Sequence, residues 1–529
     1  MTNAHVDSIS LEVFRHRCTA VAEEMGVALG RSAFSPNIKE RRDFSCAVFD
    51  VAGRMVAQAA HIPVHLGAMP RSVEAALACH TLHPGDVVVL NDPYQGGTHL
   101  PDLTTVAPVF DENECIGYTA TRAHHADVGG ITPGSMPMSR ELLQEGLIIP
   151  PVKLVSGGVI NEALIDLICR NSRTGDERRG DLVAQLACHR VGATRLVQLT
   201  EQHGKTWLVQ HMEALLRYGE RHMRTLLESI PDGVYVFEDY LDDDGQDSKP
   251  LVLRVSITVQ NDSAVIDFGG TAPQCRGPLN APRAVAEAAV LYCFRCLASS
   301  DMPASAGAFT PLTMVIPEGS VLNPRPPAPV AGGNVETSQR VVDVVFGALA
   351  QVLPDRIPAA SAGTMNNLTF GGVDPVSGIS FAYYETLGGG MGARPTAPGL
   401  DGVQVHMTNT LNTPIETLER LLPVQVQQYA LRTGSGGAGA QRGGDGLVRE
   451  IKFLVPVTLS LLTERRTMSP YGLNGGQMGT PGRNTLTSTD GAIQILPGKT
   501  TVFVDEGSLL RVETPGGGGW GKPSASADE

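Results

Sequence analysis

The chain has 529 residues, of which 42% are apolar and 18% charged, a composition typical of a soluble globular protein with two to four domains. Its formal net charge of -14, from 41 basic and 55 acidic residues, argues against nucleic acid or an anionic membrane as its partner. The start has no apolar signal segment, no apolar run approaches the length of a membrane span, and the nine cysteines are scattered, which together predict a cytoplasmic protein.

Helices and strand pairs follow one another irregularly along the chain. Ser8 is the predicted N-cap of the first helix, and Gly30 is its predicted end. Because steady alternation of strand and helix is missing, the pattern predicts an α+β fold with domains at 1–229, 230–340 and 341–529. The predicted elements are a helix at 8–30, a hairpin at 44–58, a helix at 69–80, a strand at 85–92, strands at 103–110 and 115–125, one helical zone over 180–228, a strand meander over 233–270, a helix at 281–298 and a Gly-rich, strand-rich last third.

Two of these strands, at 103–110 and 115–125, are joined by a polar turn and predict a hairpin. Closing the hairpin at that turn places Asp102 opposite Ala123, with His124 beside it across the ladder. The open end of the hairpin is therefore where a carboxylate and an imidazole come together.

A second imidazole comes from the turn "NDPYQGGTHLPD", in which His99 precedes Asp102 by three residues. Two imidazoles and one carboxylate at one end of a hairpin suit a divalent metal ion, with a solvated loop as the alternative interpretation. The geometry depends on register, because a slip of one residue would bring His125 to the site in place of His124.

Seven stretches of sequence occur in an order that resembles the hydantoinase B family, from about residue 7 to about residue 521. That family includes the B-type subunits of ATP-dependent hydantoinases and lactam hydrolases, the C-terminal part of 5-oxoprolinase and one component of acetone carboxylases. The stretches are "NIKERRDFSCAVFD", "NDPYQGGTHLPD", "RAHHADVGG", "GGNVETSQRVVD", "ETLGGGMGARP", "HMTNTLNTPIE" and "TERRTMSPYGLNGG".

The resemblance implies a set of metal ligands in this chain. Carried over from the family's motifs, the ligands are Glu40, His99, Asp102 and His124. Asp43 is the nearest alternative to Glu40. A set of nitrogen and oxygen donors without thiolate suits manganese, zinc or iron.

Further polar residues near these motifs are candidates for supporting or catalytic roles. His125 and Asp127 could orient the imidazole ligands or move protons as general base or acid. His61 and His65 lie on either side of Pro63, which disfavours a helix, so a structural or ligand-supporting role is expected for them.

No phosphate-binding loop of the type GxxxxGK[ST] occurs in the sequence, so ATP chemistry is not expected to start on this chain. The resemblance implies instead that ATP is bound by a separate A-type subunit, in an A2B2 hetero-oligomer. We expect the substrate pocket to be shared by the stretches "TMNNLTFGG", "FAYYETLGGGMGARP" and "HMTNTLNTP".

Two enzymatic functions and one non-enzymatic function are compatible with the resemblance. The expected function is ring opening of a hydantoin, 5-oxoproline or lactam that the partner has activated by phosphorylation. The alternative is a subunit of an ATP-dependent ketone carboxylase. A scaffold for the A-type subunit is the third, and the intact set of ligand candidates argues against it.

Overall fold

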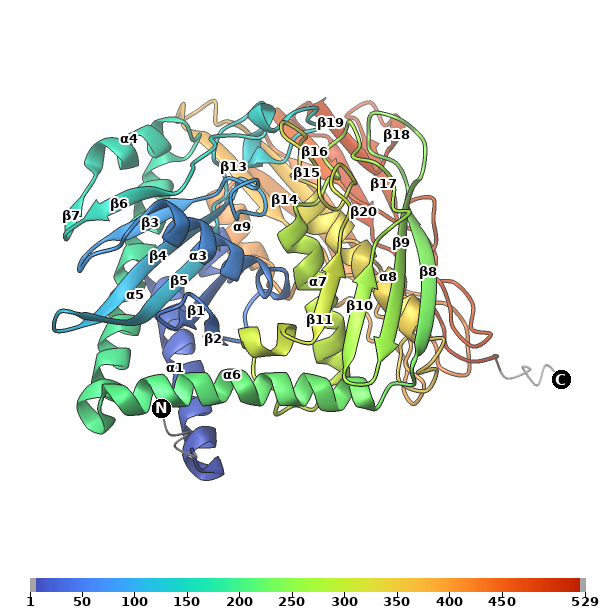
Figure 1. Cartoon of the computed structure of the whole chain (residues 1–529). Coiled ribbons are helices and arrows are strands. Elements are labelled where there is room, and N and C mark those ends of the chain that lie inside the picture. The colour runs from blue at the N-terminus through green and yellow to red at the C-terminus, as the bar shows by residue number, and fades with distance from the viewer. Residues whose placement is uncertain (1–5, 524–529) are drawn as a thin grey trace.

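The computed structural model describes residues 6–523 as a mixture of helices and mostly antiparallel sheets, which confirms the α+β, multidomain class. Figure 1 shows the N-terminal sheet and the β-meander sheet side by side, with the long helix α6 (Lys205–Glu228) running beneath both. The C-terminal sheets lie behind them. None of the helices in the described part is long and apolar enough to cross a bilayer.

The seven-stranded N-terminal sheet, called sheet 1 from here on, carries most of the residues that the sequence motifs single out. It is covered on one face by α1 (Ser8–Ser32) and α5 (Gly175–His203), and α3 (Ala68–Cys79) lies against its other face. Short helices α2 (Pro36–Lys39) and α4 (Glu162–Arg170) flank it. Its strands, in spatial order, are β2 (Met55–Gln58), β1 (Phe44–Phe49), β5 (Glu114–His124), β4 (Asp102–Asp111), β3 (Val87–Leu90), β6 (Val152–Ser156) and β7 (Val159–Ile160).

Sheet 2 is the predicted meander, extended by one strand that pairs in parallel. Helix α8 (Ser338–Leu349) packs on this sheet and against α7 (Arg283–Leu297). A π-helical turn, Gly333–Thr337, leads directly into α8. The strands, in spatial order, are β11 (Leu312–Val315), β10 (Ser263–Asp267), β9 (Leu251–Gln260) and β8 (Gly233–Leu241).

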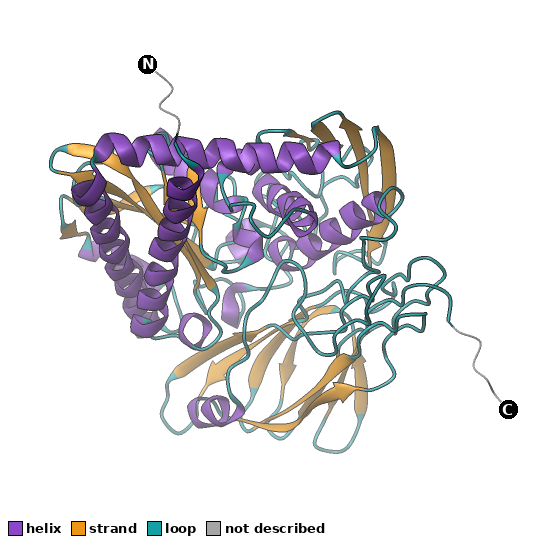
Figure 2. Cartoon of the chain, turned by 90° about the horizontal axis from the view of Figure 1, so that it is seen from below, coloured by secondary structure: helices purple, strands orange, loops and turns teal. Residues whose placement is uncertain are grey.

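Sheets 3 and 4 form the C-terminal part together with α9 (Ile415–Leu421) and long glycine-rich loops, which Figure 2 shows beside the sheets. The loops pack backbone against backbone: a Cβ on Gly517 would lie 2.2 Å from the carbonyl oxygen of Met391. Sheet 3 contains β13 (Ser380–Glu385), β12 (Asn367–Val373), β16 (Val457–Leu462) and β19 (Lys499–Val504); sheet 4 contains β14 (Val424–Arg432), β15 (Gly446–Phe453), β20 (Leu509–Glu513), β17 (Arg483–Thr487) and β18 (Ile493–Leu496).

The predicted helix boundaries differ from the structure at several places; the first helix, for example, runs past its predicted end at Gly30 to Ser32. The first helix is capped by Asp7 instead of Ser8, because the Asp7 carboxylate accepts hydrogen bonds from the backbone N–H groups of Ile9 and Ser10. The predicted helical zone is two helices, since Gly204 adopts φ 83 and ψ 151 between them. That conformation is open to glycine and breaks the helix direction.

The apolar core does not follow the predicted domain boundaries. One buried cluster includes Phe49 and Val106 of sheet 1, Val255 of sheet 2, Phe294 of α7 and Leu462 of sheet 3. The three predicted parts are thus packed against one another, and their boundaries at residues 229 and 340 stay a prediction.

A buried histidine between α5 and sheet 1 makes the fold sensitive to acid. His189 on α5 lies 2.9 Å from the Thr105 hydroxyl and 2.8 Å from the Thr119 hydroxyl, and burial lowers its pKa from 6.5 to about 3. As the pH falls, the unfolded chain therefore protonates His189 before the folded chain does. The stability that the neutral, buried His189 side chain provides is present above pH 6.5 and is lost as the pH falls toward 3. Between pH 8 and pH 5 the loss is roughly 2 kcal/mol.

Replacing His189 with Gln removes this titration, and we expect the free energy of unfolding of His189→Gln to change less between pH 8 and pH 5 than that of the wild type. Denaturant unfolding at each pH measures the difference. The exposed His83 provides the control variant His83→Gln, which should keep the wild-type pH dependence. An unchanged slope in His189→Gln would contradict the assignment.

Candidate metal centre

The hairpin of β4 and β5 has a register one residue different from the predicted one. Asp102 pairs with His124 instead of Ala123, because the register shifts between Val109 and Phe110. A β-bulge there adds one residue to β5 and moves every later pair along by one. Since directly paired residues of an antiparallel ladder point to the same face, the shift places the Asp102 and His124 side chains together.

His99, Asp102 and His124 form a tight, fully buried cluster. One ligand atom from each lies within 4.8 Å of the others, an arrangement that could hold a metal ion. The Oδ1 atom of Asp102 lies 3.0 Å from Nε2 of His99 and 3.2 Å from Nδ1 of His124. The turn that carries His99 is held in place by the amide of Asn91, which donates to the carbonyl oxygen of Leu100 at 2.7 Å.

The two oxygens of Asp102 have different partners. While Oδ1 faces the two imidazoles, Oδ2 accepts a hydrogen bond from the Thr98 hydroxyl at 2.7 Å and from the Asn334 amide at 3.3 Å. Nε2 of His65 also lies 3.5 Å from Oδ2, and its Nδ1 lies 2.9 Å from the Ser45 hydroxyl. These donors hold the carboxylate so that Oδ1 stays directed at the two imidazoles.

Burial and charge act in opposite directions on this cluster. Burial alone would raise the pKa of the Asp102 carboxyl, but the charge of His99 and hydrogen bonds from the surrounding imidazoles hold it well below its usual range. Burial would lower the pKa of His99, but the negative charge of Asp102, together with the hydrogen bonds of the ring to Asp102 and to the Ala331 carbonyl, outweighs burial and the pKa is raised. Burial lowers the pKa of His124. An ionised carboxylate between imidazoles is an environment that attracts a cation.

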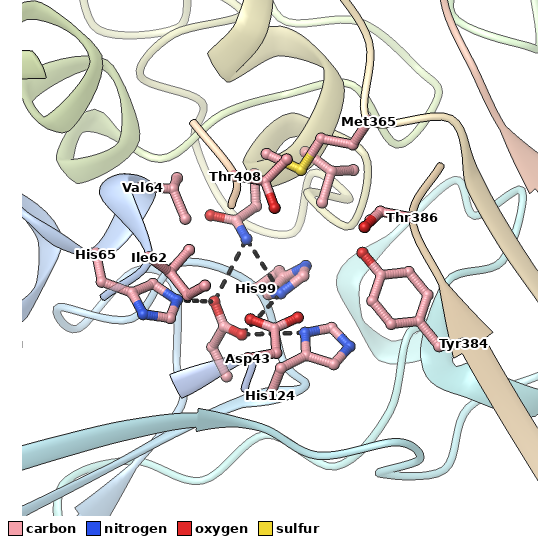
Figure 3. A pocket seen from close by; sticks show the side chains of 13 residues that line it. Asp43, Ile62, Val64, His65, His99, His124, Met365, Tyr384, Thr386 and Thr408 are labelled. Atoms are coloured by element: carbon pink, nitrogen blue, oxygen red, sulfur yellow. Dashed lines mark hydrogen bonds and ion pairs between the residues drawn. The ribbon is translucent and has the colours of Figure 1, made fainter. Parts of the chain in front are cut away.

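Elements from the second half of the chain complete the pocket. Figure 3 shows Asp43, His65, His99 and His124 on one side, with Tyr384, Thr386 and Met365 facing them. The three stretches expected to share the pocket each contribute to it. The lining residues are Asp43, Ile62, Val64, His65, His99, Asp102, His124, Asn334, Val335, Met365, Tyr384, Thr386 and Thr408.

Asn334 and Tyr384 belong to this site although the sequence alone did not single them out as site residues. The Tyr384 ring stacks on His124 with a centroid distance of 4.5 Å, and its hydroxyl donates to the Asn367 side chain at 2.8 Å. Asn334 follows two glycines at the start of the π-helical turn before α8. That pattern is a local indication of a constrained backbone, but nothing in it tells which residues the side chain meets.

The two candidates for the fourth ligand lie in different surroundings. Asp43 is buried and lines the pocket, and its carbonyl oxygen accepts a hydrogen bond from the backbone N–H of His124 at 2.9 Å. Glu40 is half-buried at the C-terminal end of α2 and is not among the lining residues.

His125 and Asp127, the expected proton-transfer residues, are not brought to the pocket. The His125 ring turns to the opposite face of the sheet, where Nε2 lies 3.0 Å from the Gln185 side chain on α5. The Asp127 carboxylate accepts hydrogen bonds from the backbone N–H groups of Gly129, Gly134 and Arg173 and from the Arg173 guanidinium. Both side chains thus hold loops and helices next to the site.

Two buried polar atoms at the pocket lack a hydrogen-bond partner among the described residues: Nε2 of His124 and Oδ1 of Asn334. Leaving such an atom without a partner costs about 1–3 kcal/mol, and native proteins tolerate this where a ligand supplies the partner. Together with a donor set of two imidazoles and one or two carboxylates, the unpartnered imidazole nitrogen fits a divalent transition metal.

Residues 7–523 match the family described as Hydantoinase B/oxoprolinase. The chain belongs to this family. It is 43% identical over 544 residues to 5-oxoprolinase 1 of Arabidopsis thaliana, with 97% of this chain and 42% of that protein covered. It is 31% identical over 539 residues to a Pseudomonas protein provisionally named as the B-type subunit of a D-/L-hydantoinase, with 98% and 90% covered.

The chain therefore spans about two fifths of the length of the plant 5-oxoprolinase that it matches, and nearly all of the bacterial hydantoinase component. Its structure superposes on that of the ATP-dependent caprolactamase from Pseudomonas jessenii with a TM-score of 0.91 and 28% sequence identity. The superposition covers 98% of this chain and 91% of that one. The Hydantoinase B/oxoprolinase family thus accounts for the whole described fold.

Proposed function

We propose that this chain is the metal-dependent subunit of an ATP-dependent cyclic amide hydrolase, which opens a hydantoin, 5-oxoproline or lactam ring. The observation that carries the proposal is the buried cluster of His99, Asp102 and His124, in a fold similar to that of an ATP-dependent caprolactamase. The names of the relatives refer to cyclic amides, which supports this substrate class.

The residues of the pocket have separate tasks in this proposal. His99, Asp102 and His124 hold a manganese, zinc or iron ion, and Asp43 is the proposed fourth ligand in place of Glu40. A divalent ion bound there supplies Lewis-acid activation of water near neutral pH. Thr98 and Asn334 keep Asp102 oriented by hydrogen bonds to its Oδ2 atom.

The covalent steps follow from the chemistry of an amide that is phosphorylated on oxygen. Water adds across the carbon–nitrogen double bond: its oxygen bonds to the carbon, and one proton goes to the nitrogen. The carbon–nitrogen bond then breaks, the ring nitrogen leaves as an amine with the hydroxyl proton, and an acyl phosphate remains. A second water displaces phosphate and leaves the carboxylate.

ATP is bound by an A-type partner, in an A2B2 hetero-oligomer. The sequence of this chain has no GxxxxGK[ST] motif, and its similarity to the B-type component of a hydantoinase supports a separate A-type partner. The activated substrate then passes from the partner to the metal pocket of this chain.

The test is to incubate this chain with its A-type partner, magnesium and ATP. The substrate panel is hydantoin, 5-oxoproline, 2-pyrrolidinone, caprolactam, and acetone with bicarbonate. We expect ADP and a ring-opened product from one of the cyclic amides, identified by mass, and neither from this chain alone. A carboxylated ketone as product, or ATP turnover by the isolated chain, would contradict the proposal.

The identity of the fourth ligand is tested by a matched pair of substitutions. We expect Asp43→Asn to lower metal affinity by about 10- to 100-fold, a loss comparable to that for residues that directly support a metal site. Glu40→Gln should retain the ion, because Glu40 is not at the pocket. Competition with a chelator of known affinity measures both; the reverse order of the two variants would restore Glu40 as the ligand.

A further inference from the structure

Asn334 offers the pocket a hydrogen-bond acceptor that no group of the described residues uses. Its Nδ2 atom lies 3.1 Å from Nε2 of His99 and 3.3 Å from Oδ2 of Asp102, while its Oδ1 atom is buried without a partner. Nδ1 of His99 lies 3.3 Å from the carbonyl oxygen of Ala331, three residues before Asn334. One segment of chain therefore contacts both ends of the His99 ring.

The backbone around Asn334 is held firmly. A Cβ on Gly333 would lie 1.9 Å from the carbonyl oxygen of Asn280, so only glycine allows this close approach. The carbonyl oxygen of Asn334 accepts a hydrogen bond from the Ser338 hydroxyl at 2.7 Å. Because Nδ2 is anchored on Asp102, the position of Oδ1 is determined by contacts on both sides.

The cavity beside Asn334 is small. It measures about 20 Å³, which is room for about one water molecule. The acceptor Oδ1 of Asn334 and the unpartnered Nε2 of His124 both belong to residues that line it. A water in this cavity would satisfy Oδ1 by donating one of its hydrogens.

We propose that Asn334 positions the water that attacks the activated amide carbon. Its Oδ1 atom accepts one O–H of that water, which leaves the second proton free to pass to the ring nitrogen and directs an oxygen lone pair at the carbon. The inference rests on the proposed function, because it assigns a role in the same hydrolysis.

The first test needs no substrate. In a high-resolution crystal structure of the zinc-loaded chain, we expect a water about 2.7–3.2 Å from Oδ1 of Asn334, and no water at that place in Asn334→Ala. An Oδ1 atom without water in the zinc-loaded wild type would overturn the proposal.

The second test compares ADP and ring-opened product in the complex with the A-type partner. With zinc added in excess, so that the lost hydrogen bond to Asp102 does not empty the site, Asn334→Ala should retain its ion and lower the kcat of ring opening by about 100-fold with little change in KM, as expected when a reacting group is misplaced. ADP formation should continue. Asn484→Ala is the matched control, since Asn484 is another buried amide that does not line the pocket and should keep the wild-type ratio of product to ADP.

Each outcome of the second test decides one of the two proposals. Wild-type product formation in Asn334→Ala, or loss of the ion together with the product, would overturn the role of Asn334. Wild-type product formation in a His99→Ala complex measured beside it would instead overturn the proposed function.

A separate set of contacts closes the pocket toward solvent. Residues 61–64 and 407–409 meet along a line that we call the seam: the backbone N–H of Val64 donates to the carbonyl oxygen of Met407 at 3.2 Å, and the Asn409 amide donates to that of His61 at 3.3 Å. Thr408 is buried and lines the pocket, whereas the next residue, Asn409, is exposed. The segment 407–409 therefore has one residue at the pocket and the next at the surface.

We infer that the seam is the entrance to the pocket and has to part before any molecule larger than water can enter. The cavity is too small for a five-membered ring, and every side chain that lines it is buried. The two seam hydrogen bonds are a weak barrier, because a single intramolecular hydrogen bond adds little net stability once its exchange with water is counted.

Access through the seam can be measured without metal or partner. A cysteine placed at the pocket residue Met365 (Met365→Cys) is labelled with methyl methanethiosulfonate, and peptide mass spectrometry follows the modification. We expect Asn409→Ala to increase the labelling rate about 2- to 10-fold, the effect of one lost hydrogen bond. Val342→Cys, a buried thiol on α8 outside the pocket, is the control and should not respond.

Locking the seam gives the opposite result. A disulfide formed between His61→Cys and Asn409→Cys, in a background where the exposed Cys79 and Cys296 are serine, should slow labelling at position 365 at least about 10-fold. Reducing this disulfide and removing the reductant before the label is added should restore the rate. Labelling at position 365 that changes with neither the Asn409→Ala substitution nor the disulfide would overturn the assignment of the entrance.

Discussion

His99→Ala and His124→Ala are each expected to lose most of the bound divalent ion while the chain stays folded. Each imidazole contributes one of the few donor atoms within reach of the site, and the remaining donors cannot complete a coordination shell. The purified wild type should contain about one ion per chain. Elemental analysis measures the ion, and thermal unfolding confirms that each variant is folded.

His125→Ala is the control for this prediction, because His125 is adjacent to His124 and equally buried but contacts Gln185 on the other face of the sheet. It should keep the ion although it loses packing. Full metal retention in both His99→Ala and His124→Ala would show that the cluster is not the metal site. Loss of the ion in His125→Ala alone would show that the ion binds on the other face of the sheet, where His125 lies.

Asp102→Asn is expected to separate ATP hydrolysis from ring opening. The substitution keeps the size of the side chain but removes the negative charge that lies between His99 and His124. Loss of a residue that holds the reacting group should lower ring opening by orders of magnitude. Assembly with the partner should survive, because the change is confined to the buried start of β4. Substrate-dependent ADP formation then continues as the activated intermediate decays in water.

The measurement is the ratio of ADP to ring-opened product for wild-type and Asp102→Asn complexes under the same conditions. We expect a ratio near one for the wild type and a ratio that rises by orders of magnitude for the variant. Ring opening at the wild-type rate would refute the role of the metal cluster. Equal loss of ADP and product would instead show that the sites of the two subunits are tightly coupled.

The hairpin of β4 and β5 shows how much of the site could be predicted from local sequence patterns. The alternation of apolar residues and the polar turn correctly predicted both strands, and the turn before β4 correctly predicted that His99 and Asp102 lie together. The pairing of Asp102 with His124 was not predictable, since the bulge near Gly117 depends on a neighbouring strand. A Cβ on Gly117 would lie 2.4 Å from the carbonyl oxygen of Phe49 on β1.

The sequence by itself determined the α+β class, most element positions and the His–Asp turn, because apolar periodicity, turn residues and capping groups act over only a few residues. The tertiary structure decided which carboxylate faces the pocket and which face His125 takes. It also brought Asn334 within 3.3 Å of Asp102, 232 residues away. Such contacts arise from packing between sheets and helices distant in the chain, and no local pattern of residues encodes their distance or direction.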